Sequence, residues 1–220
     1  MKIFLASAAV GEVAWAAEAG LADGILTTPA QLHEEAAADP RGLLQDLCRA
    51  GGGSVLASVE SVHAEEMYRD GRDLARLSDQ IVVEVPLIED GVTAMRRLSA
   101  DGVRVAASLV YSPAQALLAA KAGAMVVTCA LQQLDAEGHY GLQVVEEIRG
   151  VFDAAGVECD VLAAAATSAS EFTRCVQAGA DGIAVAPATL RALLIHPLTD
   201  RGVDRFLTTL SRLPKGRLAS

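Results

Sequence analysis

The residue in this sequence best suited to chemistry is Glu84, which interrupts the otherwise apolar segment 81–86. A charged side chain among apolar neighbours is costly to bury unless it faces a wet or paired site. Burial raises the pKa of a carboxyl group toward neutrality, where the group can act as a general acid or base. The alternative is that Glu84 only pairs with a neighbour or with water in a cavity without function.

A second carboxyl group, Glu60, stands two residues after Ser58 at the end of another apolar segment. Side chains two apart on a strand share one side, so Glu60 and Ser58 are expected to face the same way and to bring Glu60 near Glu84. Two close carboxyl groups would separate their pKa values and provide one acid and one base. Glu60 could equally point outward into the following loop.

Two histidines, His63 and His139, stand in predicted loops and can gain or lose a proton near pH 7. Each is either a further catalytic group or a solvated loop residue. Glu60, Glu84, His63 and His139 also have the atom types of metal ligands, but they are scattered along the chain. We therefore predict no metal site and no cofactor.

Eight short apolar segments, each followed by a stretch with helical spacing, predict repeated strand–helix units. The strands are expected at residues 3–7, 24–28, 55–60, 81–86, 103–110, 124–131, 160–166 and 182–187. Helices are expected at residues 64–77, 93–100, 114–121, 141–155 and 170–178, among others. Nearly all-apolar strands suit a parallel sheet buried on both faces, and eight units close most simply into a (β/α)8 barrel. An open doubly wound sheet lacks support, because no glycine-rich phosphate motif follows the first strand.

The barrel is expected to form one domain over residues 1–220, with an extra C-terminal helix and tail at 199–220. That helix, at 199–213, packs either on a neighbouring subunit or as a solvated cap. Glycines just before strands are expected in the left-handed conformation that ends a helix. They are Gly20, Gly102, Gly123, Gly156 and Gly179. In such a barrel, reactive side chains come from the carboxyl-terminal ends of the strands.

Composition excludes several classes of function. The formal charge of −10 disfavours binding to nucleic acid and to anionic membrane surfaces. The four cysteines form no CxxC pair, so buried free thiols in a reducing cytoplasm are expected. Cys129 should face away from the lumen if its neighbour Ala130 faces inward. The N-terminus lacks an apolar leader, which also favours a cytoplasmic location.

Several motifs together resemble the small transaldolase family that includes fructose-6-phosphate aldolase. They are IVVEVP at 81–86, GILTTP at 24–29, Val110-Tyr111 with Ala114-Gln115, LDAEG at 134–138 and VLAA at 161–164. The resemblance runs from end to end of the chain and implies a (β/α)8 barrel. It also implies a homo-oligomer, because members of this family tend to form rings through a terminal helix.

The resemblance implies that Glu84 stands where the family carries its Schiff-base lysine. A glutamate has no nitrogen nucleophile and cannot form an iminium with a ketose. The family's strand-one aspartate would correspond to Ala6, the asparagine of its second strand to Thr28, and the tyrosine that positions water to Ala130. Its phosphate-binding arginine and serine would correspond to Gln133 and Ala165, and two further pocket residues to Ser58 and Ser108.

Three hypotheses follow. The leading one is a transaldolase-like enzyme that uses Glu84 for acid–base chemistry of the lyase or isomerase type on a small hydroxylated or carbonyl, sugar-like compound. Its substrate would contact the hydroxyl and amide groups of Thr28, Ser58, Ser108 and Gln133. The second is a catalytically silent homologue that serves as a binding or assembly protein. The third is residual transaldolase or fructose-6-phosphate aldolase activity, which one of the three lysines would have to support.

Overall fold

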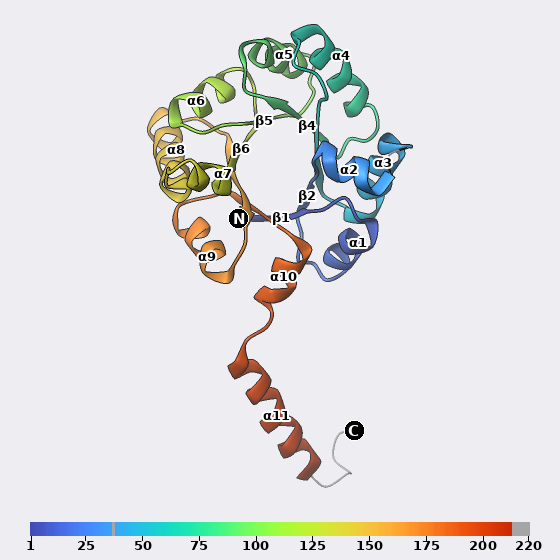
Figure 1. The fold of residues 1–220 in the computed structure, drawn as a ribbon, viewed down its shortest axis with the longest axis vertical. Coiled ribbons are helices and arrows are strands. Elements are labelled where there is room, and N and C mark those ends of the chain that lie inside the picture. The colour runs from blue at the N-terminus through green and yellow to red at the C-terminus, as the bar shows by residue number, and fades with distance from the viewer. Residues whose placement is uncertain (37, 213–220) are drawn as a thin grey trace.

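Eight parallel strands form a closed barrel in which each strand pairs with its neighbours in chain order, from β1 to β8 and back to β1 (Figure 1). The structure is a computed structural model, and it describes residues 1–36 and 38–212. The strands are β1 (Lys2–Ala6), β2 (Gly24–Leu26), β3 (Ser54–Ser58), β4 (Ile81–Pro86), β5 (Val105–Ser108), β6 (Val126–Ala130), β7 (Asp160–Ala166) and β8 (Gly182–Val185). The predicted (β/α)8 barrel is therefore confirmed.

Apart from α11, the helices cover the outside of the barrel, with one or two of them after each strand (Figure 1). They are α1 (Val10–Glu18), α2 (Pro29–Ala36), α3 (Pro40–Gly51), α4 (Ala64–Ala75), α5 (Glu89–Ala100), α6 (Pro113–Lys121), α7 (Leu131–Ala136), α8 (Gly141–Ala155), α9 (Ala169–Gln177), α10 (Pro187–Leu193) and α11 (Pro197–Arg212). Each of the five predicted glycine caps has a positive φ, between 63° and 101°. Glycine adopts this conformation without the steric cost that a Cβ atom imposes.

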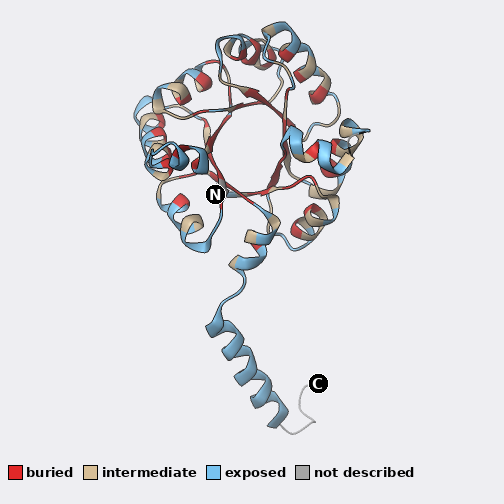
Figure 2. Cartoon of the chain, in the orientation of Figure 1, coloured by how far each residue is buried: buried red, intermediate tan, exposed pale blue. Residues whose placement is uncertain are grey.

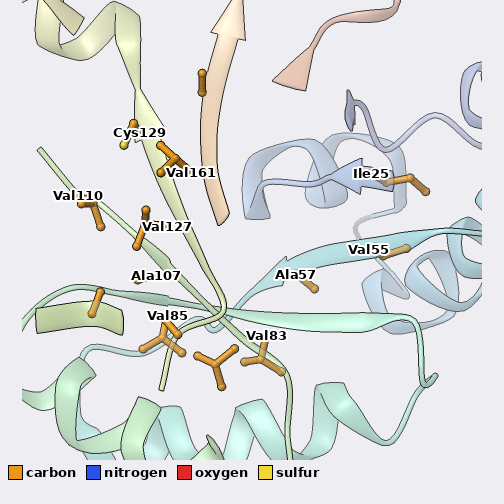
Figure 3. Packing of buried hydrophobic residues seen from close by; sticks show 14 of the residues in the cluster. Ile25, Val55, Ala57, Val83, Val85, Ala107, Val110, Val127, Cys129 and Val161 are labelled. Carbon is orange, nitrogen blue, oxygen red and sulfur yellow. The ribbon is translucent and has the colours of Figure 1, made fainter. Parts of the chain in front are cut away.

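Two apolar clusters lie on the two faces of the barrel wall. Odd-numbered strand residues such as Val83, Val127 and Val161 pack outward in one cluster with the helices (Figure 3). Even-numbered residues fill the lumen as a second cluster, formed by Phe4, Leu26, Leu56, Val82, Ala106, Val126, Leu162, Ala164 and Ala184. The strands are mostly buried (Figure 2), and burial on both faces explains why they are nearly all apolar.

Cys129 belongs to the outer cluster (Figure 3), which confirms that it faces away from the lumen. All four cysteines are buried free thiols. Burial raises the pKa of Cys129 and of Cys159 to about 12. Such thiols carry little thiolate near neutral pH, so they behave as packing residues.

One contact joins the two ends of the barrel sequence. Arg191 on α10 lies over the ring of Trp15 on α1, with its guanidinium carbon 3.5 Å from the ring centroid. The same guanidinium pairs with Glu12 at 2.6 Å. This contact fixes α10 against α1 just before the chain leaves the barrel.

The C-terminal helix α11 extends away from the barrel, and none of its residues is buried (Figures 1 and 2). The predicted extra helix is therefore present, beginning two residues earlier than expected. Residue 213 and the predicted tail, 214–220, lie outside the described residues. Among the residues that are described, no helix combines the length and the apolar character needed to cross a membrane.

Candidate functional site

Glu84 lies on the lumen side of β4 with only 5% of its surface exposed. Two hydroxyl groups hold its carboxyl group. Ser58 Oγ donates to Oε2 at 2.7 Å, and Thr128 Oγ1 donates to Oε1 at 3.0 Å. Each carboxyl oxygen therefore has a partner, which offsets part of the cost of burying the group.

Strand register explains how these three side chains meet. Ser58 on β3 is the direct partner of Glu84, and Ala106 on β5 is its partner on the other side. Thr128 belongs to β6, one strand beyond Ala106. Because the side chain of Ala106 is a single methyl group, the Glu84 side chain can pass it and reach Thr128. A large residue at position 106 would fill that path.

Burial raises the pKa of Glu84, and the hydrogen bonds from Ser58 and Thr128 lower it by a smaller amount. The net direction is upward, so Glu84 keeps its proton to a higher pH than an exposed glutamate does. A carboxyl group with a raised pKa can donate a proton when neutral and accept one when ionised. Position and burial thus give Glu84 the properties of an acid–base group.

The lumen is open at the carboxyl-terminal end of the strands. Ala6, Ser58, Ser108 and Ala130 occupy the inward positions there, and all four are partly exposed. Below them, Glu84, Thr128 and Ala164 retain exposures of 5%, 8% and 8%. These small side chains line the carboxyl-terminal end of the lumen, which we call the bowl, and the nearly buried Glu84 carboxyl group lies beneath them.

The predicted pairing of Glu60 with Glu84 is not formed. Strand β3 ends at Ser58, and Glu60 lies exposed beyond it. The Glu60 backbone N–H donates to Asp70 Oδ2 on α4 at 3.0 Å, which draws the chain toward the outer helices. Alternation of side chains therefore stops before Glu60, and within the described part of the chain no hydrogen bond joins the two carboxyl groups.

Neither candidate histidine forms a hydrogen bond with Glu84 in the described structure. His63 precedes α4 with a side chain 73% exposed, and its Nδ1 is 3.9 Å from Asp90 Oδ2. His139 is exposed and lines a cleft together with Tyr111 and Gln133. In the described residues, no three His, Cys, Asp or Glu side chains gather in a way that could hold a metal ion.

The predicted binding residues are placed differently from one another. Ser58 contacts Glu84, and Ser108 lies at the rim of the bowl. Thr28 is exposed, and its hydroxyl accepts from the Gln31 N–H at 3.2 Å at the start of α2. Gln133 is exposed on α7, and its Oε1 accepts a hydrogen bond from the Tyr111 hydroxyl. Ser58 alone among these four bonds to Glu84 in the described structure.

Sequence reasoning missed Thr128 as a member of the site. The signal was present, because an inward Ala130 requires an inward residue two positions earlier on the same strand.

The architecture and the site define a (β/α)8 barrel with a buried carboxyl group on the floor of its open end. Comparison with known proteins identifies the family of this barrel. The chain belongs to the transaldolase/fructose-6-phosphate aldolase family, whose model matches residues 18–215.

Among curated relatives, a "probable transaldolase" of Thermodesulfovibrio yellowstonii is 35% identical over 215 residues, covering 98% of this chain and 100% of the relative. A protein of the same description from Prosthecochloris aestuarii is 36% identical over 223 residues, with 98% and 100% covered. A third, from Ruegeria pomeroyi, is 37% identical over 210 residues and covers 96% of both chains.

Proposed function

We propose that this member of the transaldolase family is an acid–base enzyme that forms no iminium with its substrate. The observation that carries the proposal is Glu84, a buried carboxyl group with a raised pKa on the floor of the open lumen. Its place on the fourth strand is where the resemblance puts the family's Schiff-base lysine. A carboxylate cannot replace an amine in that chemistry.

The two lysines among the described residues, Lys2 and Lys121, give no support to an iminium route. Lys2 lies at the amino-terminal end of β1, where its Nζ pairs with Asp160 Oδ2 at 2.7 Å. Lys121 is the last residue of α6 and is exposed. Both lie away from the carboxyl-terminal end of the barrel, and Lys215 falls outside the described residues.

In the proposed reaction, ionised Glu84 removes a proton from a carbon next to a carbonyl group of a small hydroxylated compound. The same carboxyl group then returns the proton to a neighbouring atom, which gives isomerisation, or to a departing hydroxyl, which gives dehydration. Ser58 and Thr128 hold the carboxylate while it is charged. Glu60 and His63 take no step, because both are exposed and neither is hydrogen-bonded to Glu84 among the described residues.

The direct test is exchange of carbon-bound hydrogen for deuterium in heavy water, followed by NMR for a panel of hydroxyaldehydes and hydroxyketones. Exchange reports proton abstraction even where no net product forms. The parent protein is expected to catalyse exchange, and Glu84→Gln to lose it by about 100-fold or more, the usual contribution of a general base. Glu34→Gln, an exposed glutamate on α2, is the control. Equal exchange by Glu84→Gln and the parent would exclude the proposal.

A second candidate is the catalytically silent homologue, which acts as a binding or assembly protein. It is favoured by the fact that both oxygens of Glu84 already accept hydrogen bonds within the chain. Absence of exchange for every compound, with the fold intact, would support it. Residual transaldolase activity is tested by borohydride trapping with a ketose phosphate, where a stable adduct would show an iminium and overturn the acid–base proposal.

We also propose that the protein is a homo-oligomer whose α11 packs on a neighbouring copy. Five large apolar residues of this helix are exposed, namely Leu198, Val203, Phe206, Leu207 and Leu210. Light scattering after gel filtration is expected to show an oligomer for the parent and a monomer for Phe206→Asp. Thr208→Asp on the same helix is the matched control, and a monomeric parent would contradict the proposal. Four buried free thiols further support a cytoplasmic location.

A further inference from the structure

The two hydroxyl groups that hold Glu84 differ in their access to solvent. Ser58 is the last residue of β3 and is partly exposed, and its Oγ donates to Glu84 Oε2 at 2.7 Å. Thr128 lies two residues before the end of β6 and is buried, and its Oγ1 donates to Oε1 at 3.0 Å. Of the two partners of the carboxyl group, Ser58 is therefore the one with a surface open to the bowl.

The hydrogens of these hydroxyl groups limit where Glu84 can carry its own proton. Each hydroxyl group has one hydrogen and two acceptor sites, and both hydrogens point at Glu84 while it is ionised. When Glu84 becomes neutral, its protonated oxygen donates to one hydroxyl oxygen, and the hydrogen of that hydroxyl group needs another acceptor. A buried hydrogen-bond donor without an acceptor costs about 1–3 kcal/mol.

Ser58 can meet this demand more readily than Thr128. Among the described residues, each of the two side chains has its one hydrogen bond with Glu84. The partly exposed Ser58 can turn its hydrogen to water in the bowl. The buried Thr128 would lose its bond without gaining one from solvent. The proton of neutral Glu84 is therefore more stable on Oε2, between Glu84 and Ser58.

We propose that Ser58 is a proton relay between Glu84 Oε2 and water in the bowl, and that Thr128 holds Oε1 without taking part in the transfer. On release, the bond between Oε2 and its proton breaks as the proton moves to Ser58 Oγ, and the original hydrogen of Ser58 moves to a water molecule, which becomes hydronium. Uptake uses the same bonds in reverse. The serine is neutral before and after each transfer, and no bond to carbon changes.

The inference rests on the proposed function in one respect, that Glu84 is a base which must pass on its proton before it can act again. Other groups offer no alternative carrier within the described residues. The two side chains hydrogen-bonded to Glu84 are Ser58 and Thr128, and the lumen cluster that includes Ala106 and Ala164 is apolar. Burial and the same two hydroxyl groups set the direction of the pKa shift of Glu84.

The rate at which Glu84 gains a proton tests the proposal and needs no substrate. A laser-induced drop in pH is followed by infrared absorption of carboxyl groups, and the Glu84 signal is the difference from Glu84→Gln. Ser58→Val and Ser58→Thr form a matched pair, because the two side chains have nearly the same shape and threonine alone keeps the hydroxyl group. Protonation is expected to be at least about 10-fold slower in Ser58→Val than in Ser58→Thr, a modest effect for a positioned proton-transfer group.

Ser58→Ala adds no volume and gives the same comparison against the parent, with slower protonation again expected. Ser170→Ala changes an exposed serine on α9 and is the control, which should protonate at the rate of the parent.

Thr128→Val separates the relay from the hydrogen bond. It removes one bond to the charged form of Glu84, as Ser58→Val does, so both variants raise the pKa of Glu84. The protonation rate of Thr128→Val should nevertheless stay within about threefold of the parent, because the path through Ser58 is intact. Equal rates in Ser58→Val and Ser58→Thr, or equal slowing by Thr128→Val and Ser58→Val, would each overturn the proposal. Failure of the acid–base function would appear in the deuterium exchange of substrates, and failure of this inference in the protonation rates.

Discussion

The burial of Glu84 leads to a pH-dependent effect on stability that Glu84→Gln should remove. In the folded protein the pKa of Glu84 is raised, chiefly by burial. Between the pKa of the unfolded chain, about 4.3, and the higher folded pKa, the folded state holds a proton that the unfolded state releases. Stability from this group is therefore full below about pH 4.3 and is lost as the pH rises through the folded pKa.

The magnitude follows from the contacts of the carboxyl group. Burying an ion costs several kcal/mol, and each of the two hydrogen bonds to the charged group returns about 1.5–3 kcal/mol. Since burial outweighs these bonds, ionised Glu84 is expected to cost the fold about 1–3 kcal/mol. Glutamine has nearly the same shape, and the hydroxyls of Ser58 and Thr128 can rotate to serve its amide. The free energy of unfolding of Glu84→Gln should therefore equal that of the parent at pH 4.5. At pH 8 it should be higher than that of the parent by this amount.

Urea unfolding followed by circular dichroism, at one protein concentration and at several pH values, measures the difference. Glu34→Gln removes an exposed carboxyl group, and its free energy of unfolding should differ from that of the parent by the same amount at every pH. A difference between Glu84→Gln and the parent that stays constant within about 0.5 kcal/mol from pH 4.5 to pH 8 would refute the reasoning, because burial would then not govern the proton affinity of Glu84.

Three further variants test the surroundings of the site. Thr128→Val removes a hydrogen bond that lowers the pKa of Glu84, so the rise of deuterium exchange with pH should move to higher pH. Ala106→Leu places extra volume where the Glu84 side chain passes, and should lower the free energy of unfolding by about 1–3 kcal/mol and abolish exchange. Arg191→Ala loses the contact with Trp15, and its urea midpoint should fall by an amount equivalent to about 1 kcal/mol with an unchanged slope.

Much of the fold follows from the sequence, because burial of a parallel strand on both faces leaves a clear apolar pattern. The segment 160–166 was predicted with its observed bounds. The apolar pattern does not predict where a strand ends when the backbone conformation or a tertiary contact decides it. The segment 103–110 was predicted as one strand, yet β5 spans only Val105–Ser108, since Leu109 leaves the strand with a φ of 57°. Nothing in the residue type of a leucine indicates that conformation.

The candidate site shows the same division between local pattern and tertiary contact. Glu84 was found because a charged residue in an apolar strand stands out locally. Of the two alternatives for Glu60, the structure has the one in which it points outward, because its position depends on Asp70, a side chain of the next helix that accepts its backbone N–H. The alternation of side chains along a strand does not predict that contact. The lumen-facing position of Thr128 follows from alternation alone, because side chains two residues apart on a strand occupy the same face of the sheet.

The size of Ala106 connects the fold to the chemistry. The carboxyl group of Glu84 reaches Thr128 across β5, and a side chain of one carbon on the strand between them leaves the path clear. Without Thr128, the carboxyl group would keep the Ser58 bond alone and its proton affinity would rise. The single methyl group of Ala106 thus lets a second hydroxyl restrain the pKa of Glu84. A buried carboxyl group with one partner would remain neutral over a wider pH range and make a poorer base near neutral pH. The pair of hydroxyls keeps the charged form accessible, which is what a residue that both accepts and returns a proton requires.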